Sequence, residues 1–238
     1  MEQERADREM REAMGGMGSP GPDRVFTDRI EAGAALASAL RGSVPGDAVV
    51  LGIPRGGVVV ASEVAARLGL QLDVVIPRKV GAPGNPELGL GAIAEGVRVL
   101  DERLIRILAV SPAYLDAEVE TQEREIARRT ALYRQGRPPV PVEGRPVVVV
   151  DDGVATGGTA LAALRWASAA GASRVLFAAP VAPPETLERL AADADQVFVL
   201  STPAAFYAVG QWFLDFPQVG DDEVIEILRR VGTAPAGG

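Results

Sequence analysis

Residues 147–160 read VVVVDDGVATGGTA, and this stretch decides the fold. Four consecutive valines predict a strand buried on both faces, because apolar runs without alternation are typical of parallel sheets covered by helices. The strand ends in two carboxylates, Asp151 and Asp152, and small or hydroxylated residues lead from there into an expected helix. Carboxylates at the tip of a buried strand indicate a binding site at that edge of the sheet.

Further apolar segments alternate along the chain with segments of helical pattern. Asp28 with Glu31 resembles a capping box at the start of the first predicted helix, IEAGAALASAL, which should end near Gly42. Such alternation favours parallel strands joined by helices. We therefore predict an α/β fold with a doubly wound, mainly parallel sheet of about five strands and helices on both faces. The expected strands cover residues 48–53, 72–77, 147–150, 174–181 and 196–202.

The rest of the chain divides by composition. Residues 1–22 mix both charges with Gly, Ser and Pro, and we expect a disordered tail there. Residues 23–238 are then predicted to form one domain, with a helical insertion at about residues 101–140. Its long helix should begin at Ser111-Pro112, which is a favourable cap and first-turn pair.

Composition excludes several kinds of chemistry. The 238 residues carry a formal net charge of −8 and include neither cysteine nor histidine. This excludes disulfides, thiolate nucleophiles, Ser-His-Asp catalysis and His- or Cys-bound metals, and leaves Mg²⁺ on oxygen ligands as the natural metal. The acidic balance disfavours nucleic acid as a partner. No apolar run approaches the roughly 20 residues of a membrane helix, and no signal-peptide pattern is present, so we expect a cytoplasmic protein without a membrane partner.

The segment after the aspartates has the composition of a phosphate site. Small residues leave backbone N–H groups exposed, and the start of the next helix adds its positive end, so a phosphate monoester would be held well. The aspartates suit sugar hydroxyls or a magnesium ion beside that phosphate, and a sugar phosphate satisfies both features. The plainer alternative is that the aspartates cap the helix while the glycines allow close packing. The predicted cradle consists of Ala155, Thr156, Gly157, Gly158 and Thr159.

VVVVDDGVATGGTA resembles the signature of the type I phosphoribosyltransferases, which use phosphoribosyl pyrophosphate. The resemblance implies that Asp151 and Asp152 hold the ribose hydroxyls and that the loop from Ala155 to Thr159 wraps the 5-phosphate. Gly153 departs from the pattern, since the family usually has an apolar residue there. The run ATGGT is closest to the adenine-type members, although the acceptor stays unassigned.

Two further stretches extend the resemblance. GIPRGG resembles the pyrophosphate loop, which implies that Arg55, Gly56 and Gly57 bind pyrophosphate. Relatives often have a cis peptide there, which by position would be Pro54–Arg55. An ordinary strand-to-helix turn with a solvated arginine is the alternative.

In PRKVGAPGNPE, Arg78 and Lys79 resemble a basic pair that precedes a mobile loop and contacts pyrophosphate. Residues 81–88 contain two Pro and two Gly and are expected to form that loop, whereas 92–100 could form a hairpin. A surface hinge with solvated charges is the alternative. Glu95 could contact magnesium or base, but a lone glutamate is usually solvated.

An aromatic stretch near the C-terminus could form a small hood over a nucleobase or could plug the end of the sheet. It contains Phe206, Tyr207, Trp212 and Phe213. Residues of such a hood would determine which acceptor binds. Because this segment has no interpretable motif, the sequence leaves the identity of the acceptor open.

The resemblance implies a Mg²⁺-dependent transfer of the phosphoribosyl group to a nucleobase-like acceptor, with release of pyrophosphate. Arg78, Lys79, Asp151 and Asp152 would carry catalysis, and the two aspartates would contact the metal only indirectly. Relatives are commonly dimers, so a homodimer is compatible with it. The alternative is a non-catalytic sensor of phosphoribosyl pyrophosphate or a nucleotide. A phosphatase-like enzyme ranks last, because it needs a nucleophilic aspartate in a different spacing.

Overall fold

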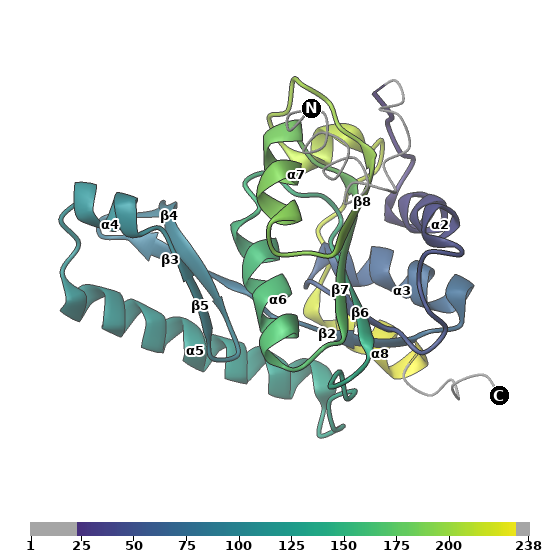
Figure 1. Cartoon of the computed structure of the whole chain (residues 1–238), viewed down its shortest axis with the longest axis horizontal. Helices are drawn as coiled ribbons and strands as arrows, with labels where there is room; N and C mark the ends of the chain where they lie inside the picture. Colours follow the sequence, from purple (N-terminus) through teal and green to yellow (C-terminus); the bar gives the residue numbers. More distant parts are fainter. Residues whose placement is uncertain (1–22, 232–238) are drawn as a thin grey trace, which may run out of the picture.

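The computed structural model describes residues 23–231, so the predicted tail at residues 1–22 lies outside the described residues (Figure 1). A five-stranded parallel sheet forms the centre of the molecule, as the apolar segments predicted, in the order β2-β1-β6-β7-β8. All four valines of residues 147–150 are fully buried in it. Its strands are β1 (Val49–Gly52), β2 (Gln71–Val74), β6 (Pro146–Val150), β7 (Arg174–Val181) and β8 (Gln196–Ser201).

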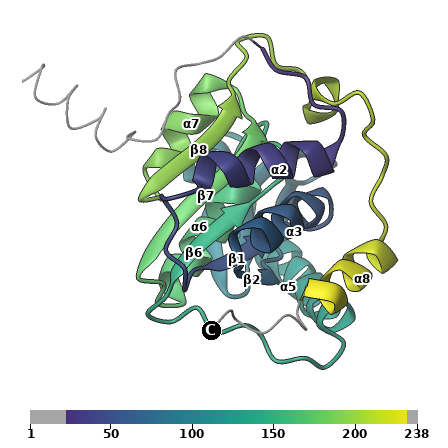
Figure 2. The same cartoon turned by 90° about the vertical axis from the view of Figure 1, so that its right-hand side faces the viewer.

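Helices cover both faces of this sheet, which confirms the doubly wound prediction (Figure 2). Alternate residues of each strand turn to opposite faces. Val148 and Val150 therefore pack toward α2 (Arg29–Leu40) and α3 (Gly56–Leu68). Val147 and Val149 pack on the other side, with α6 (Gly158–Ala169) and α7 (Pro184–Ala191). Asp28 caps α2 by accepting a hydrogen bond from the amide of Glu31, as expected.

Strand order places the site. The chain leaves β1 toward β2 on one side, and it leaves β6 toward β7 on the other. The order therefore reverses between β1 and β6, and open sheets of this kind bind ligands at the carboxyl ends of the strands beside such a reversal. The PRGG loop follows β1 and the DDG loop follows β6, so both lie at this point.

A second unit projects from this body, and we call it the arm (Figure 1). It consists of an antiparallel sheet of β3 (Arg78–Ala82), β4 (Asn85–Ala94) and β5 (Val97–Leu100), with α4 (Glu102–Ile107) and α5 (Pro112–Arg134). The hairpin expected in residues 92–100 is present. The loop expected over residues 81–88 is wrong, because these residues belong to β3, a tight turn and β4. Proline is tolerated there because Pro86 lies near the strand start, beside an irregular register.

The long helix α5 ties the arm to the body. Val119, Ile126 and Tyr133 form its buried stripe, as its spacing predicted, and Ser111 caps it. Near its C-terminus Arg134 reaches into the body, where its Nε donates to Oδ1 of Asp73 on β2 at 3.2 Å. Both residues are less than a tenth exposed. A buried ion pair therefore fixes where the arm leaves the body.

The C-terminal segment closes the carboxyl end of the sheet. Its short 3₁₀ helix η1 (Val209–Trp212) leads to α8 (Asp221–Val231), which packs on α3 and α5. Trp212 and Phe213 are buried against Phe26, and the rings of Phe26 and Phe213 lie 5.7 Å apart. These two aromatic residues therefore plug the sheet end, whereas Tyr207 is 89% exposed. Among residues 23–231, no helix has the length and apolar character needed to cross a membrane.

Candidate active site

The PRGG and DDG loops touch each other at the carboxyl end of the sheet. A Cβ on Gly57 would lie 2.9 Å from both Cα and Oδ1 of Asp151, and one on Gly56 would overlap the Asp152 carboxylate. Only glycine allows this close approach. The peptide Pro54–Arg55 is cis, as predicted. The structure thus brings together two segments that lie about a hundred residues apart in the sequence.

The two aspartates share an unusual electrostatic environment. Burial and the neighbouring charge of Asp152 raise the pKa of Asp151 well above its ordinary value. The pKa of Asp152 is also raised by burial, but the Arg29 guanidinium opposes that rise. Two crowded carboxylates are costly unless hydroxyl donors or a cation compensate them, so the pair is suited to a polar ligand.

Arg29 is a site residue that the sequence reasoning missed. Its Nε donates to Oδ2 of Asp152 at 2.7 Å, and its Nη1 donates to the carbonyl of Pro217 at 2.8 Å. The guanidinium also stacks on the ring of Phe216 at 3.7 Å. Arg29 therefore links Asp152 to the C-terminal segment. The one available signal was an arginine in the first turn of an apolar helix, where a basic residue is unfavourable for the helix dipole.

The loop after the aspartates leads into the start of α6, where the cradle was predicted. Gly157 has φ +79° and precedes α6, whose first residues are Gly158 and Thr159. Within the described part of the chain, no acceptor is assigned to the backbone N–H groups of Ala155, Thr156 and Gly157. The first N–H groups of α6 also lack partners within the helix, as at every helix start. The site thus presents several amide donors near two carboxylates.

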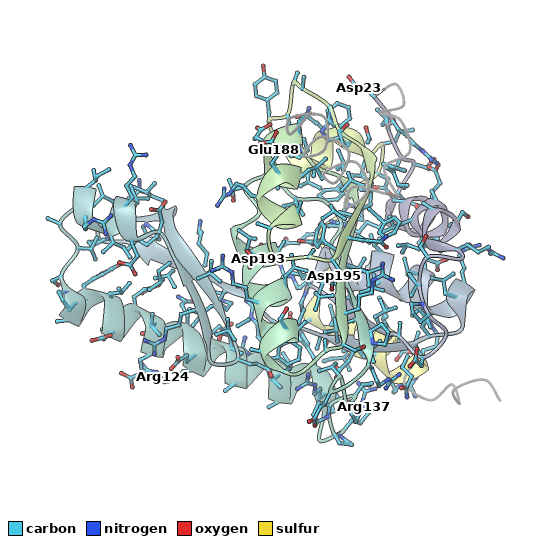
Figure 3. All side chains as sticks on the ribbon, viewed as in Figure 1. Asp23, Arg124, Arg137, Glu188, Asp193 and Asp195 are labelled. Atoms are coloured by element: carbon cyan, nitrogen blue, oxygen red, sulfur yellow. The ribbon has the colours of Figure 1, made fainter. Side chains whose placement is uncertain are left out.

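A cleft of about 840 Å³ opens beside the cradle, between the arm and α6–α7. Thr156, Gly158 and Thr159 line it on the body side, and Lys79 lines it on the arm side. Farther along it, Arg165 forms a two-point ion pair with Asp193, which is labelled in Figure 3. The cradle is therefore reached through a space bounded by both units of the molecule.

The basic pair of β3 is divided between the two faces of the arm sheet, since successive strand residues point to opposite sides. Lys79 pairs with Ala92, on the face toward α6, and its side chain runs over Gly89. Arg78 points toward α5, where its Nε donates to Gln122 at 2.9 Å. Burial and the nearby charge of Arg129 lower the pKa of Arg78. Only Lys79 of the two lines the cleft.

Comparison with known proteins agrees with this geometry. The family model described as "Phosphoribosyl transferase domain" matches residues 27–212, which include both loops and the cradle. The chain belongs to the phosphoribosyl transferase family.

Relatives in this family cover most of the chain. Two curated proteins of Mycobacterium tuberculosis, "Putative phosphoribosyl transferase Rv0571c" of strain H37Rv and "Putative phosphoribosyl transferase MT0597" of strain CDC 1551, are 47% identical over 208 residues. The match covers 87% of this chain and 47% of each relative, so the chain spans about half the length of these proteins. The crystal structure of TT1426 from Thermus thermophilus is 49% identical, with a TM-score of 0.75, over 87% of this chain and 99% of that one.

The departure of Gly153 from the phosphoribosyltransferase pattern has a packing explanation. A Cβ at Gly153 would lie 2.4 Å from Cγ1 of Val209 and 3.1 Å from Cγ1 of Val181. The side chain of Val209, which begins η1, therefore occupies the space that an apolar residue at position 153 would need. Val209 of the C-terminal segment thus provides the apolar packing at this turn that residue 153 does not.

Two sequence candidates lie in contacts of their own. Arg55 approaches Asp221 of α8, with Nη1 3.8 Å from Oδ1, and Tyr133 donates to the same carboxylate oxygen at 2.7 Å. Burial and that hydrogen bond raise the pKa of Tyr133 to about 12. Glu95 lies at the β4–β5 turn and contacts Thr130 and Arg134. The carboxylate of Glu95 therefore belongs to the attachment of the arm.

The donor set at the aspartates suits a magnesium ion carried by a substrate. Mg²⁺ is usually held by one or two carboxylates together with substrate phosphates. Among residues 23–231, no cluster of three or more metal-ligating side chains is found. Asp151 and Asp152 provide carboxylates beside the expected phosphates, so a magnesium ion would be held mainly by the substrate, and the aspartates would contact it only indirectly.

Proposed function

We propose that this protein transfers the phosphoribosyl group of phosphoribosyl pyrophosphate to a nucleobase-like acceptor and releases pyrophosphate, with Mg²⁺ as the metal. One observation carries the proposal: the glycines of the PRGG loop pack directly on Asp151 and Asp152 at the point where the strand order reverses. A ligand held by both loops would place its sugar hydroxyls between an anion site and the amide cradle. Phosphoribosyl pyrophosphate has these three parts in that order.

The residues of the chain would act by position and charge. The cradle amides would bind the 5-phosphate, and the aspartates would accept hydrogen bonds from the ribose hydroxyls. Lys79 would stabilise the negative charge that develops on the leaving pyrophosphate, together with the amides after Arg55. When bound, magnesium would supply further charge neutralisation on that group. No protein nucleophile is needed, because the departing pyrophosphate leaves an oxocarbenium-like ribose that the acceptor nitrogen attacks.

The decisive experiment measures pyrophosphate release from phosphoribosyl pyrophosphate with Mg²⁺ and a panel of nucleobases. We expect release that depends on one base or on a narrow set, and that stops when EDTA removes the metal. A parallel calorimetric titration measures binding without acceptor. Failure to bind phosphoribosyl pyrophosphate at millimolar concentration would sink the proposal.

A second function, a non-catalytic sensor of the same ligand, is favoured by the packing of the hood. Trp212 and Phe213 are buried against Phe26, so neither ring can stack on an acceptor base in this arrangement. Binding of phosphoribosyl pyrophosphate without turnover on any base would support the sensor. The curated relatives are about twice as long as this chain, so an activity of a relative need not belong to the part that the two share. The assay must therefore use this chain itself.

A further inference from the structure

Helix α7 holds the cradle from behind through two side chains one turn apart. The hydroxyl of Thr186 donates to the carbonyl of Ala155 at 2.5 Å. Nη1 of Arg189 donates to the carbonyl of Thr156 at 2.8 Å. Two consecutive peptide carbonyls of the cradle are therefore turned toward the same helix. Glu188, which is labelled in Figure 3, marks this turn of α7.

This arrangement fixes where the cradle amides point. In a trans peptide the C=O and N–H bonds are directed to opposite sides. Among the described residues, Pro54–Arg55 is the only cis peptide, so the cradle peptides are trans. The carbonyls of Ala155 and Thr156 point to α7, and the N–H groups of Thr156 and Gly157 must therefore point away from it. Neither N–H group has an acceptor in the described part of the chain.

The fit of Gly157 against α7 is close. A Cβ at this glycine, which has φ +79°, would lie 3.1 Å from Cγ2 of Thr186. Thr186 itself is only 2% exposed. A buried hydroxyl that donates to a loop carbonyl at short distance is a specific support, since a valine of the same shape could fill the space but could not donate.

Helix α7 also brings a positive charge that the cradle sequence lacks. Residues 153–159 contain no basic side chain, although a phosphate monoester is strongly anionic. Arg189 lines the same cleft as Thr156 and Thr159, and its contact with Thr156 uses one N–H group of the five in a guanidinium. Because the amides of Thr156 and Gly157 point away from α7, Arg189 would act on an anion held there through its nearby positive charge and through its hold on the Thr156 carbonyl.

We propose that α7 is part of the phosphate site: Thr186 and Arg189 are positioning residues that hold the carbonyls of Ala155 and Thr156 and so aim the amides of Thr156 and Gly157 at the phosphate, and Arg189 adds a positive charge beside the loop. The nature of the ligand rests on the proposed function, whereas the role of α7 rests on the contacts with the carbonyls of Ala155 and Thr156.

The test measures the affinity for ribose 5-phosphate and, separately, for pyrophosphate by calorimetry. R189Q keeps an amide donor for the carbonyl of Thr156 but removes the charge, and it should weaken binding of ribose 5-phosphate by about threefold, because a positive charge near the phosphate is lost without a direct contact. T186V should weaken binding of ribose 5-phosphate about fivefold, since the amides of Thr156 and Gly157 would then be less well oriented. Both variants should leave pyrophosphate affinity within about twofold of wild type, because that ligand's site lies on the other loop.

Controls separate a site effect from general damage. T121V makes the same chemical change at an exposed position of α5, where the Thr121 hydroxyl donates to the carbonyl of Ala117, and should bind ribose 5-phosphate as wild type does. T186S keeps the hydroxyl and should restore affinity if T186V loses stability. In wild type, ribose 5-phosphate should shift the amide NMR signals of Thr156 and Gly157, and the shift should shrink in T186V.

The outcomes distinguish the two proposals. If R189Q and T186V bind ribose 5-phosphate as tightly as wild type, the role of α7 is overturned while phosphoribosyl transfer can stand. If wild type binds ribose 5-phosphate through these amides but transfers to no acceptor, the proposed transferase fails while the role of α7 stands. If wild type binds no phosphate ligand, both are overturned.

Discussion

In the body, the candidate site residues lie on loops at strand ends, whereas in the arm they lie within a strand. The difference decides how residues that are adjacent in sequence are used. Asp151 and Asp152 both stay at the site because a loop can turn both toward the PRGG glycines. Arg78 and Lys79 are separated by the alternation of β3, so one joins the cleft and the other joins the packing against α5. Adjacent charges form a functional pair only where the backbone lets them share a face.

The largest effect we expect concerns the joint between the two units. Arg134→Met removes the charged partner of buried Asp73 and should reduce the free energy of unfolding by about 3–5 kcal/mol, because the buried carboxylate is left without a counter-charge and keeps only the amides of Val74 and Val140 as donors. Chemical denaturation measures this value. Arg128→Met is the matched control, since the exposed pair of Arg128 with Glu125 is screened by solvent and its loss should leave the unfolding midpoint almost unchanged. Equal effects of the two variants would show that the joint does not depend on this ion pair.

The next effect tests the division of the basic pair directly. Lys79→Ala should reduce kcat/KM for phosphoribosyl pyrophosphate by about a hundredfold, as expected for a group that stabilises the developing charge of the transition state. Arg78→Ala should change it by less than about threefold, because its side chain faces Gln122 rather than the cleft. Steady-state kinetics of both variants decides the matter. A larger loss in Arg78→Ala would mean that the arm rearranges to present Arg78 during turnover.

The sequence predicted the body well for a physical reason. Buried parallel strands are apolar throughout, and their carboxyl ends must meet, so VVVVDDG and the PRGG loop could be placed side by side without coordinates. The phosphate cradle at residues 155–159 stays a prediction, made from the small residues of that loop. In the arm, the loop predicted over residues 81–88 from its Pro and Gly residues was wrong. Pairing between β3 and β4 provides hydrogen bonds there, and local residue propensities do not report such pairing.

Contacts between distant segments account for the residues that were missed. Arg29 lies on α2, whereas Thr186 and Arg189 lie on α7, and all three contact loops of the candidate site. Neither helix carries a sequence motif that resembles the family. The direction of a side chain from a neighbouring helix depends on the packing of that helix, which the sequence pattern does not fix. The same holds for Val209, which fills the space over Gly153.

A smaller effect is expected at the carboxylate nearest Arg29. Asp152→Asn should lower turnover by roughly tenfold or more with the fold intact, since the neutral amide accepts weaker hydrogen bonds from the ribose hydroxyls. The pyrophosphate-release assay measures the loss, and the unfolding midpoint confirms that the variant is folded. Turnover at the wild-type rate would remove Asp152 from the proposed mechanism.

The smallest effect separates function from stability at the neighbouring carboxylate. The pKa of Asp151 is raised in the folded protein, so the folded state holds a proton that the unfolded state releases above about pH 4, and stability falls as pH rises through that window. Asp151→Asn removes this loss and keeps an oxygen to accept from the amide of Asp152. The ligand-free variant should therefore melt a few degrees higher than wild type at pH 7, and the difference should vanish below about pH 4.

Glu226→Gln on α8 provides a control of opposite sign. Hydrogen bonds from Arg229 lower the pKa of Glu226, so its contribution to stability is present above about pH 4.5 and is lost as pH falls. Because the pair of Glu226 with Arg229 is exposed and screened by solvent, Glu226→Gln should melt only slightly below wild type above about pH 4.5, whereas Asp151→Asn should melt clearly above it. Melting curves of both variants from pH 3 to pH 8 measure this difference. If Asp151→Asn melted below wild type at neutral pH, the aspartate pair would be a stabilising element of the fold, and the crowding that makes it suited to a sugar ligand would be refuted.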